Sequence, residues 1–244
     1  MREAIFIEWQ KIKGTKAWMP LLFLPLVSVL YGSVNYANNT ELLQSEWISL
    51  WTQVYLFYGL FFLPGLIGFF ASYIWSGEHR GNNMNLLLTS AVPPRIIIFS
   101  KTATVFLAVL CGQCILAVLY AVAGSFFHFS SAFPVGLFPY LLLSTALSLC
   151  MIAVQIFLSL KIRSFGIPVA ISVAISILAV LVSQNPELPI LQYLTPNVLI
   201  TLAMNHFPDT GLTAADSIGM AIGAAAIFAL ATAMSIRALH KKIL

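Results

Sequence analysis

Long apolar runs separated by short polar stretches set the pattern of the chain. Six of these runs approach or exceed the ~20 residues that a helix needs to cross the ~30 Å hydrocarbon core of a bilayer. They cover residues 17–37, 47–75, 97–124, 137–160, 165–183 and 217–236. The pattern predicts an all-α, polytopic membrane protein in which six transmembrane helices form a single transmembrane domain over residues 1–244.

The first sixteen residues follow a different, amphipathic pattern. Ile5, Trp9 and Ile12 recur at helical spacing, whereas Lys11 and Lys13 fall among polar positions. This spacing predicts an N-terminal helix over residues 1–16 that lies in the membrane interface. A basic start before an apolar run is also typical of a signal peptide. The length of the first run and its lack of a clear small-residue cleavage site favour the interfacial helix.

One further apolar stretch, residues 188–207, is interrupted by two prolines and an asparagine. As a seventh span it would place the basic C-terminus on the opposite side of the membrane from the basic N-terminus. We therefore predict that residues 184–213 form an outer-side, re-entrant helical hairpin between the fifth and sixth spans. Such a segment is tolerated where protein shields its backbone.

With six spans, the charges divide between the two sides of the membrane. All 12 Lys and Arg residues fall on one side, and five of the eight acids, Glu41, Glu46, Glu187, Asp209 and Asp216, fall on the other. The positive-inside rule then predicts that both termini are cytoplasmic. No charged residue is expected deep inside a span, and Lys101, near the start of the third, is expected to extend to the membrane surface.

Composition excludes several classes of protein. The chain is 60% hydrophobic and only 8% charged, whereas soluble domains average about 25% charged residues. The net charge of +4 does not indicate nucleic-acid binding, because the basic residues cluster at the ends of apolar runs rather than along one face. Cys111 and Cys114 form a C-x-x-C inside an apolar run without a second pair, so we interpret them as packing residues rather than zinc ligands.

The motifs of enzymes and self-energised transporters are missing from the sequence. It contains no H-E-x-x-H, no G-x-S-x-G and no G-x-x-x-x-G-K-[ST]. Ion-coupled carriers usually keep an ionisable residue near the membrane midplane, and none is predicted here. We therefore expect no cofactor in this chain, and any uphill transport must draw its energy from another polypeptide.

The polar segment 76–95 is the longest predicted on the cytoplasmic side. Within it, Met84, Leu87 and Leu88 share one face of a helix, while Arg80 and the neighbouring asparagines are polar. A short amphipathic helix of this kind can press its apolar face into a groove on a soluble partner. An ordinary solvated loop with an interfacial helix fits these residues equally well.

Several sequence runs together resemble a known family. They are L-F-Y-G-L-F-F-L-P at 56–64, E-H-R-x-N-N-x-N-L-L-L-T-S-A-V-P at 78–93, and I-x-x-S-K at 97–101. In this order, after a basic amphipathic start and two spans, they resemble the membrane subunits of type-2 ATP-binding-cassette exporters. The small permeases of the lantibiotic-protection group are especially similar.

The resemblance implies a permease of the bacterial cytoplasmic membrane that pairs with a second, identical or related permease. Two copies of a separate P-loop ATPase would bind ATP and Mg²⁺ and energise export of an amphipathic antimicrobial peptide or similar lipid-like cargo. The segment 78–89 would be the coupling helix that docks on the ATPase. Its candidate coupling residues are Glu78, His79, Arg80, Asn82, Asn83, Met84, Leu87, Leu88 and Thr89.

Two secondary expectations complete the prediction. The first, second and fifth spans are expected to line the cargo path, and Gly219 and Gly223 form a G-x-x-x-G that would pack the sixth span closely. Chance spacing in an Ala/Gly-rich helix explains this motif equally well. A membrane-embedded enzyme and a non-transporting, peptide-binding immunity protein remain alternatives, although the enzyme would need polar residues converging at one depth.

Overall fold

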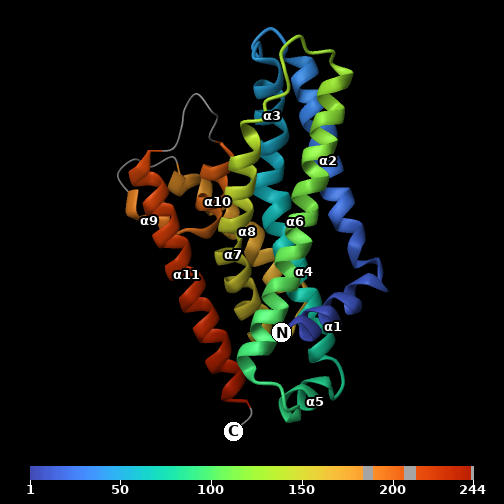
Figure 1. Ribbon diagram of the computed structural model, residues 1–244, viewed down its shortest axis with the longest axis vertical. Helices are drawn as coiled ribbons and strands as arrows, with labels where there is room; N and C mark the ends of the chain where they lie inside the picture. The colour runs from blue at the N-terminus through green and yellow to red at the C-terminus, as the bar shows by residue number, and fades with distance from the viewer. Residues whose placement is uncertain (184–188, 206–212, 243–244) are drawn as a thin grey trace.

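The computed structural model describes residues 1–183, 189–205 and 213–242. Within these ranges every regular element is a helix, and together they form an elongated bundle (Figure 1). Six helical segments in the described residues are long and apolar enough to cross a membrane. The predicted all-α class and the count of six spans are therefore confirmed.

The spans are built from nine of the helical elements. The first is the 3₁₀ turn Lys16–Trp18 followed by α2, and the second is α3, a π-helical turn and α4 in continuous succession. The bounds are α2 Met19–Asn38, α3 Glu46–Phe57, π-helical turn Tyr58–Phe62, α4 Leu63–His79, α6 Pro94–Phe126, α7 Leu137–Lys161, α8 Gly166–Ser183 and α11 Ala214–His240.

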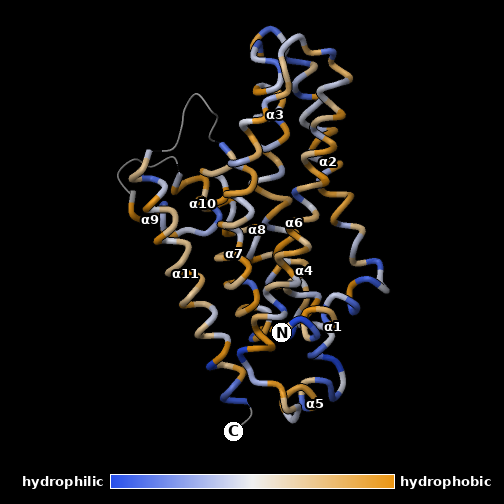
Figure 2. Tube along the Cα trace, viewed as in Figure 1, coloured by the Kyte–Doolittle hydropathy of each residue, from blue (hydrophilic) through white to orange (hydrophobic). Residues whose placement is uncertain are grey.

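Four short helices flank the spans: α1 Arg2–Lys13, α5 Asn83–Thr89, α9 Pro189–Tyr193 and α10 Pro196–Met204. Figure 1 shows α1, α5 and the last turn of α11 at the lower end of the bundle. We call this the basic end, because the Lys and Arg residues gather there. In Figure 2 the apolar colouring follows the middle of the helices, and polar colouring concentrates at both ends.

The second and fourth spans form the interior of the bundle. Leu66 and Phe70 of α4, Val105 of α6 and Ile152 of α7 are fully buried. By contrast, α8 and α11 expose most of their surface. A helix that is apolar on all sides and exposed in the isolated chain is typical of a lipid-facing span, so the bundle presents α8 and α11 to lipid or to another membrane protein.

The second span contains an irregular turn near its middle, just before Pro64. The π-helical turn Tyr58–Phe62 ends just before Leu63, and Pro64 stands in the first turn of α4. Proline has no N–H to donate and its ring crowds the carbonyl four residues before it. The wider turn relieves this conflict without interrupting the span.

The hairpin predicted at 184–213 is described only in part, because residues 184–188 and 206–212 lie outside the described residues. In the described part, α10 is almost entirely buried. Two side chains of α3 donate to its carbonyls: Trp51 Nε1 to Met204 at 3.0 Å and Tyr55 Oη to Thr201 at 2.8 Å. The chain thus shields the α10 backbone, as a non-spanning segment at membrane depth requires.

The opposite end of the bundle is closed by hydrogen bonds between connecting segments. The Glu46 carboxylate accepts the backbone N–H and the hydroxyl of both Ser130 and Ser131. Trp47 Nε1 donates to the Ser131 carbonyl at 3.0 Å, and Tyr120 Oη donates to the Trp47 carbonyl at 2.7 Å. These bonds fix the start of α3 against the end of α6 and the loop that follows it.

Candidate functional site

The helix α5 lies beneath the spans at the basic end, between the second and third spans (Figure 1). Gly81 adopts a left-handed conformation, with φ of 55°, in the tight turn that separates α4 from α5. Glycine adopts this conformation without a steric penalty. The turn aims α5 away from the axis of α4, and Pro93 and Pro94 then begin α6.

The expected orientation of α5 is corrected by its packing. Met84, Leu87 and Leu88 are half-buried and pack against the protein's own apolar core, so most of the surface of these side chains is turned toward the spans rather than toward a partner. The reason is that α5 covers apolar surface at the ends of the spans that water would otherwise reach. The outward surface of this region is made by Arg80, Asn82, Asn83, Asn85, Leu86 and Thr89.

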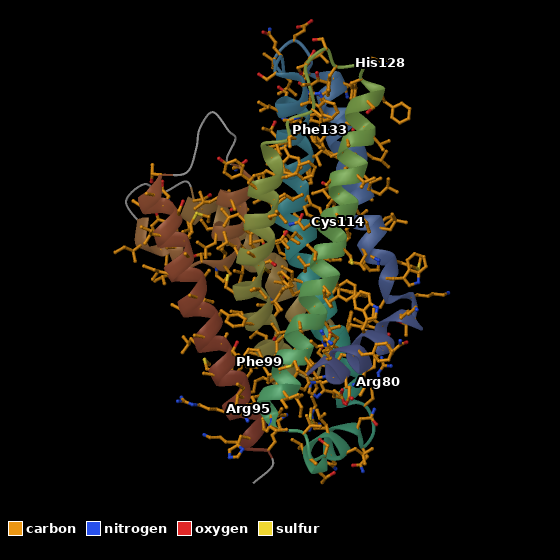
Figure 3. The ribbon with its side chains drawn as sticks, in the orientation of Figure 1. Arg80, Arg95, Phe99, Cys114, His128 and Phe133 are labelled. Atoms are coloured by element: carbon orange, nitrogen blue, oxygen red, sulfur yellow. The ribbon has the colours of Figure 1, made fainter. Side chains whose placement is uncertain are left out.

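Glu78 and His79 belong to the last turn of α4 and point into the protein. Glu78 is buried, and His79 Nε2 lies 2.8 Å from the Ser159 carbonyl oxygen of α7. Arg80, labelled in Figure 3, is exposed at the basic end. Of the candidate coupling residues, the exposed ones are therefore Arg80, Asn82, Asn83 and Thr89. Their role in ATPase coupling stays a prediction.

Four charged residues form a network directly above α5, which we call the ion quartet: Glu8, Lys11, Glu78 and Lys101. Lys101 Nζ donates to both carboxylate oxygens of Glu8, at 3.0 and 3.1 Å, and to Glu78 Oε1 at 2.9 Å. Lys11 Nζ donates to Glu78 at 2.7 Å and to Glu8 at 2.9 Å. The quartet therefore joins α1, α4 and α6.

The expectation that Lys101 extends to the membrane surface is wrong. Its side chain is 0% exposed, and its ammonium lies 4.9 Å from the centre of the Trp75 ring. Two carboxylates and an aromatic face surround the ammonium inside the protein, and these contacts replace its hydration by water. The third span thus carries a buried charge in its second turn, which sequence reasoning did not anticipate.

The quartet is electrically balanced, which makes its burial tolerable. Two ammonium groups face two carboxylates, and charge-assisted hydrogen bonds satisfy them. Burial lowers the pKa of Lys11, but the Glu78 and Glu8 carboxylates outweigh it and raise that pKa above its ordinary value. Lys11 therefore stays protonated at neutral pH. Loss of a single partner would leave a buried charge uncompensated, at a cost of about 3–5 kcal/mol.

The sequence contains an indication that the Glu8 carboxylate is buried and paired. Glu8 lies three residues after Ile5 and four before Ile12, so it shares their face of the first helix. A carboxylate on the apolar face of an interfacial helix needs a buried partner. What the sequence does not provide is the identity of that partner, because Lys101 follows Glu8 by 93 positions.

Beside the quartet, a groove of ≈ 410 Å³ opens between α1, α5 and the start of α6. Its rim is apolar and includes Ile7, Leu86 and Val92, while Glu8, Lys11 and Glu78 contribute the charged part of its wall. The outward surface of α5 and the quartet are thus neighbours.

A second, larger groove of ≈ 880 Å³ lies between the first, second and fifth spans. Its lining is almost wholly apolar and includes Phe23 of α2, Phe61 and Gly65 of the second span, and Val169 and Val173 of α8. These are the three spans that were expected to line the cargo path. The groove is large and apolar enough to hold a hydrophobic molecule. Transport through it stays a prediction.

The two glycines of the G-x-x-x-G motif lie against α9 rather than against another span. A Cβ atom built on Gly223 would lie 2.0 Å from the Tyr193 carbonyl oxygen, and one on Gly219 would lie 3.0 Å from the Tyr193 ring. Tyr193 Oη also donates to Asp216 Oδ1 at 2.7 Å. The glycines thus permit a close approach of α9 to α11.

Among the described residues, no group of three or more His, Cys, Asp or Glu side chains is arranged to hold a metal ion. The cysteines in that part of the chain are free thiols, with Cys111 and Cys114 exposed on α6 and Cys150 buried in α7. Figure 3 shows Cys114 midway along α6, distant from Arg80 and Arg95 at the basic end.

Comparison with known protein families identifies a match over most of the chain. Residues 4–179 match the family described as ABC-2 family transporter protein. No curated protein matches the sequence. The matched region spans well over half of the 244 residues and includes α1, the ion quartet, α5 and the apolar groove. This chain therefore belongs to the ABC-2 family of transporter proteins, as a membrane-embedded permease.

Proposed function

We propose that the chain is the permease subunit of an ATP-driven exporter whose energy comes from a separate P-loop ATPase. Two ATPase copies would bind ATP and Mg²⁺ and would dock on the outward surface of α5. The observation that carries this proposal is the position of α5. It lies outside the spans at the basic end, and it borders the ion pairs that Glu8 and Glu78 form with Lys11 and Lys101.

The proposal requires that the basic end face the cytoplasm. Lys and Arg residues of short loops concentrate on the cytoplasmic side of membrane proteins, and this end carries α1, α5 and the last turn of α11 (Figure 1). Both termini would then be cytoplasmic, in the cytoplasmic membrane of a bacterium, and α5 would be accessible to a soluble ATPase.

Motion would pass from the ATPase to the spans through buried contacts. Because Met84, Leu87 and Leu88 pack on the core, and α5 contacts α4, a push on α5 is delivered to the end of α4 rather than absorbed by a loose loop. The ion quartet carries the same displacement to α1. A buried, hydrogen-bonded network of this kind moves as a unit, since breaking it exposes unpaired charge.

The cargo fits the apolar groove between α2, α4 and α8. An amphipathic peptide or lipid-like molecule needs a wide apolar surface rather than an ion ligand, and the groove of ≈ 880 Å³ provides one. It opens on the side of the bundle rather than along its axis. We therefore place the cargo path at the interface with a second permease, identical or related, and infer an antimicrobial peptide as cargo.

A peptide-binding immunity protein without transport would also use the groove, but it would not need α5. An embedded enzyme would need reactive groups at one depth, and the groove offers almost none. Association with an ATPase through α5 therefore separates the proposed function from both alternatives.

Two matched substitutions test the docking surface. Leu86 is 63% exposed on α5, and Leu42 is 84% exposed at the opposite end of the bundle. Leu86→Asp should abolish co-purification of a P-loop ATPase and sensitise the host to the peptide, because it places a charge in a desolvated contact. Leu42→Asp should leave both unchanged. An ATPase that co-purifies equally with both variants would refute the proposal.

A further inference from the structure

A second group of cations at the basic end is separate from the ion quartet. Lys161 ends α7, Arg163 follows in the link to α8, and Arg237, Lys241 and Lys242 lie in or just after the last turn of α11. All five side chains are exposed. We call these residues the basic cluster. It draws on two helices, α7 and α11, that pack along each other.

Carboxylates do not balance the basic cluster. Three acids of the described residues belong to this end of the molecule, Glu3, Glu8 and Glu78, and the last two are already paired with Lys11 and Lys101. Within the described ranges, none of the five cations forms an ion pair with a carboxylate. Burial, together with the charges of Lys161 and Arg163, lowers the pKa of Lys242. Like charges have therefore been gathered without a counter-charge.

An exposed apolar stripe leads to the cluster along α11. Ile218, Ile222, Leu230 and Met234 recur at multiples of four residues and are 59%, 65%, 65% and 40% exposed. Each four-residue step advances about 40° around a helix of 3.6 residues per turn, so the stripe winds around α11 and only its last two members, Leu230 and Met234, share the face that reaches the basic end. Arg237 and Lys241 continue the same side of the helix at its basic end. A molecule lying along this face would meet apolar side chains first and positive charge at its end.

We propose that the basic cluster binds the phosphate-bearing headgroup of an anionic phospholipid, whose acyl chains lie along the α11 stripe. A phospholipid fits this arrangement because one molecule carries both an anionic phosphate for the cations and acyl chains for the adjoining apolar side chains of α11. Basic pockets between spans on the cytoplasmic side are typical sites for such headgroups. The proposal does not depend on the identity of the cargo or on the ATPase.

The test compares two sets of charge removal in the full chain. One variant is Lys161→Gln/Arg163→Gln/Lys242→Gln, and the matched control is Arg2→Gln/Lys13→Gln/Lys16→Gln, which removes three charges on or beside α1. Each protein is reconstituted in phosphatidylcholine containing a minor fraction of phosphatidylglycerol. It is then extracted in detergent, and the retained lipids are counted by native mass spectrometry. The charge-conserving variant Lys161→Arg/Arg163→Lys/Lys242→Arg reports on folding.

The wild type and the control should retain phosphatidylglycerol in preference to phosphatidylcholine. In the cluster variant this preference should fall by roughly fivefold per charge removed, and the charge-conserving variant should keep it. Excess inorganic phosphate should not displace the lipid. Equal retention by the cluster variant, an equal loss in the control, or displacement by inorganic phosphate would each overturn the proposal. Unchanged lipid retention with loss of a protein partner would assign the cluster to that partner instead.

Discussion

At the scale of single residues, Lys101 is the most deeply buried charged side chain among the described residues. Its ammonium is fully buried, and the carboxylates of Glu8 and Glu78 supply its counter-charge. A buried ion pair stabilises little relative to an apolar replacement, but removing one member of it is costly. The quartet is therefore better understood as a device that fixes the position of α1 than as a source of stability.

Lys101→Met should destabilise the protein by about 3–5 kcal/mol, because two carboxylates would remain buried without their main partner. The triple variant Glu8→Gln/Glu78→Gln/Lys101→Met should recover much of this loss. Lys11 is 45% exposed and would then turn to water. Thermal unfolding in detergent measures both effects. Lys13→Met, at an exposed position of α1, serves as the control and should not change the melting temperature. A melting temperature for Lys101→Met equal to that of the wild type would contradict the role assigned to the quartet.

Glu78→Lys should impair ATP-driven export more than Glu41→Lys. The sequence suggested that Glu78 contacts the ATPase, whereas the structure places its carboxylate between Lys11 and Lys101. The substitution therefore puts a third ammonium among two, and it should detach α1 before it affects docking. Glu41 is exposed at the opposite end, away from these ammonium groups. Peptide export from vesicles measures the difference, and equal, small effects of both substitutions would argue against it.

At the scale of elements, the contact between α9 and α11 depends on the absence of a side chain. A Cβ atom at Gly223 would meet backbone atoms of Tyr193, which cannot rotate away. Gly223→Ala should therefore cost about 1–3 kcal/mol through overpacking, despite the better helix propensity of alanine. Gly77 lies near the end of α4, and a Cβ atom there would have no neighbouring atom within 4 Å, so Gly77→Ala should not destabilise. Melting temperatures distinguish the two, and equal values would show that α11 has room to shift.

For α5, the sequence pattern predicts the helix but not the surface against which it packs. Helical spacing in NMNLLLT correctly predicts a short amphipathic helix after the second span. Spacing identifies an apolar face but not what covers it, and here the face packs on the chain's own core. The same limit applies to the quartet, because Glu8 and Lys101 meet only once α1 has folded back across the bundle.

At the scale of the whole molecule, hydropathy and charge predict most of the architecture. Length and apolarity alone establish six spans, since a bilayer requires both. The burial of α10 follows from its interrupted apolar run, which is too broken to span and too apolar to lie in water. The side opening between α2, α4 and α8 depends on helix crossings that no local pattern encodes.

Filling the apolar groove should separate cargo passage from ATPase docking. Gly65 lines the groove, and a Cβ atom there would sit at an ordinary 3.6 Å from Val173. Gly65→Phe should therefore fold, keep its ATPase and lose at least tenfold in peptide export, an effect of about 1.4 kcal/mol or more. Gly166→Phe, at the exposed start of α8, is the matched control. Normal export by Gly65→Phe would remove the groove from the cargo path.

Site-specific cross-linking from α5 shows whether an ATPase docks on this helix. Cys111, Cys114 and Cys150 are replaced, and a single cysteine is introduced at Leu86 or, as the control, at Leu42. Each protein is treated with a cysteine-anchored photo-cross-linker in native membranes, and the captured peptides are identified by mass spectrometry. We expect the Leu86→Cys protein to capture a P-loop ATPase and the Leu42→Cys protein to capture none. Capture of lipid alone from both positions would contradict the docking of an ATPase on α5.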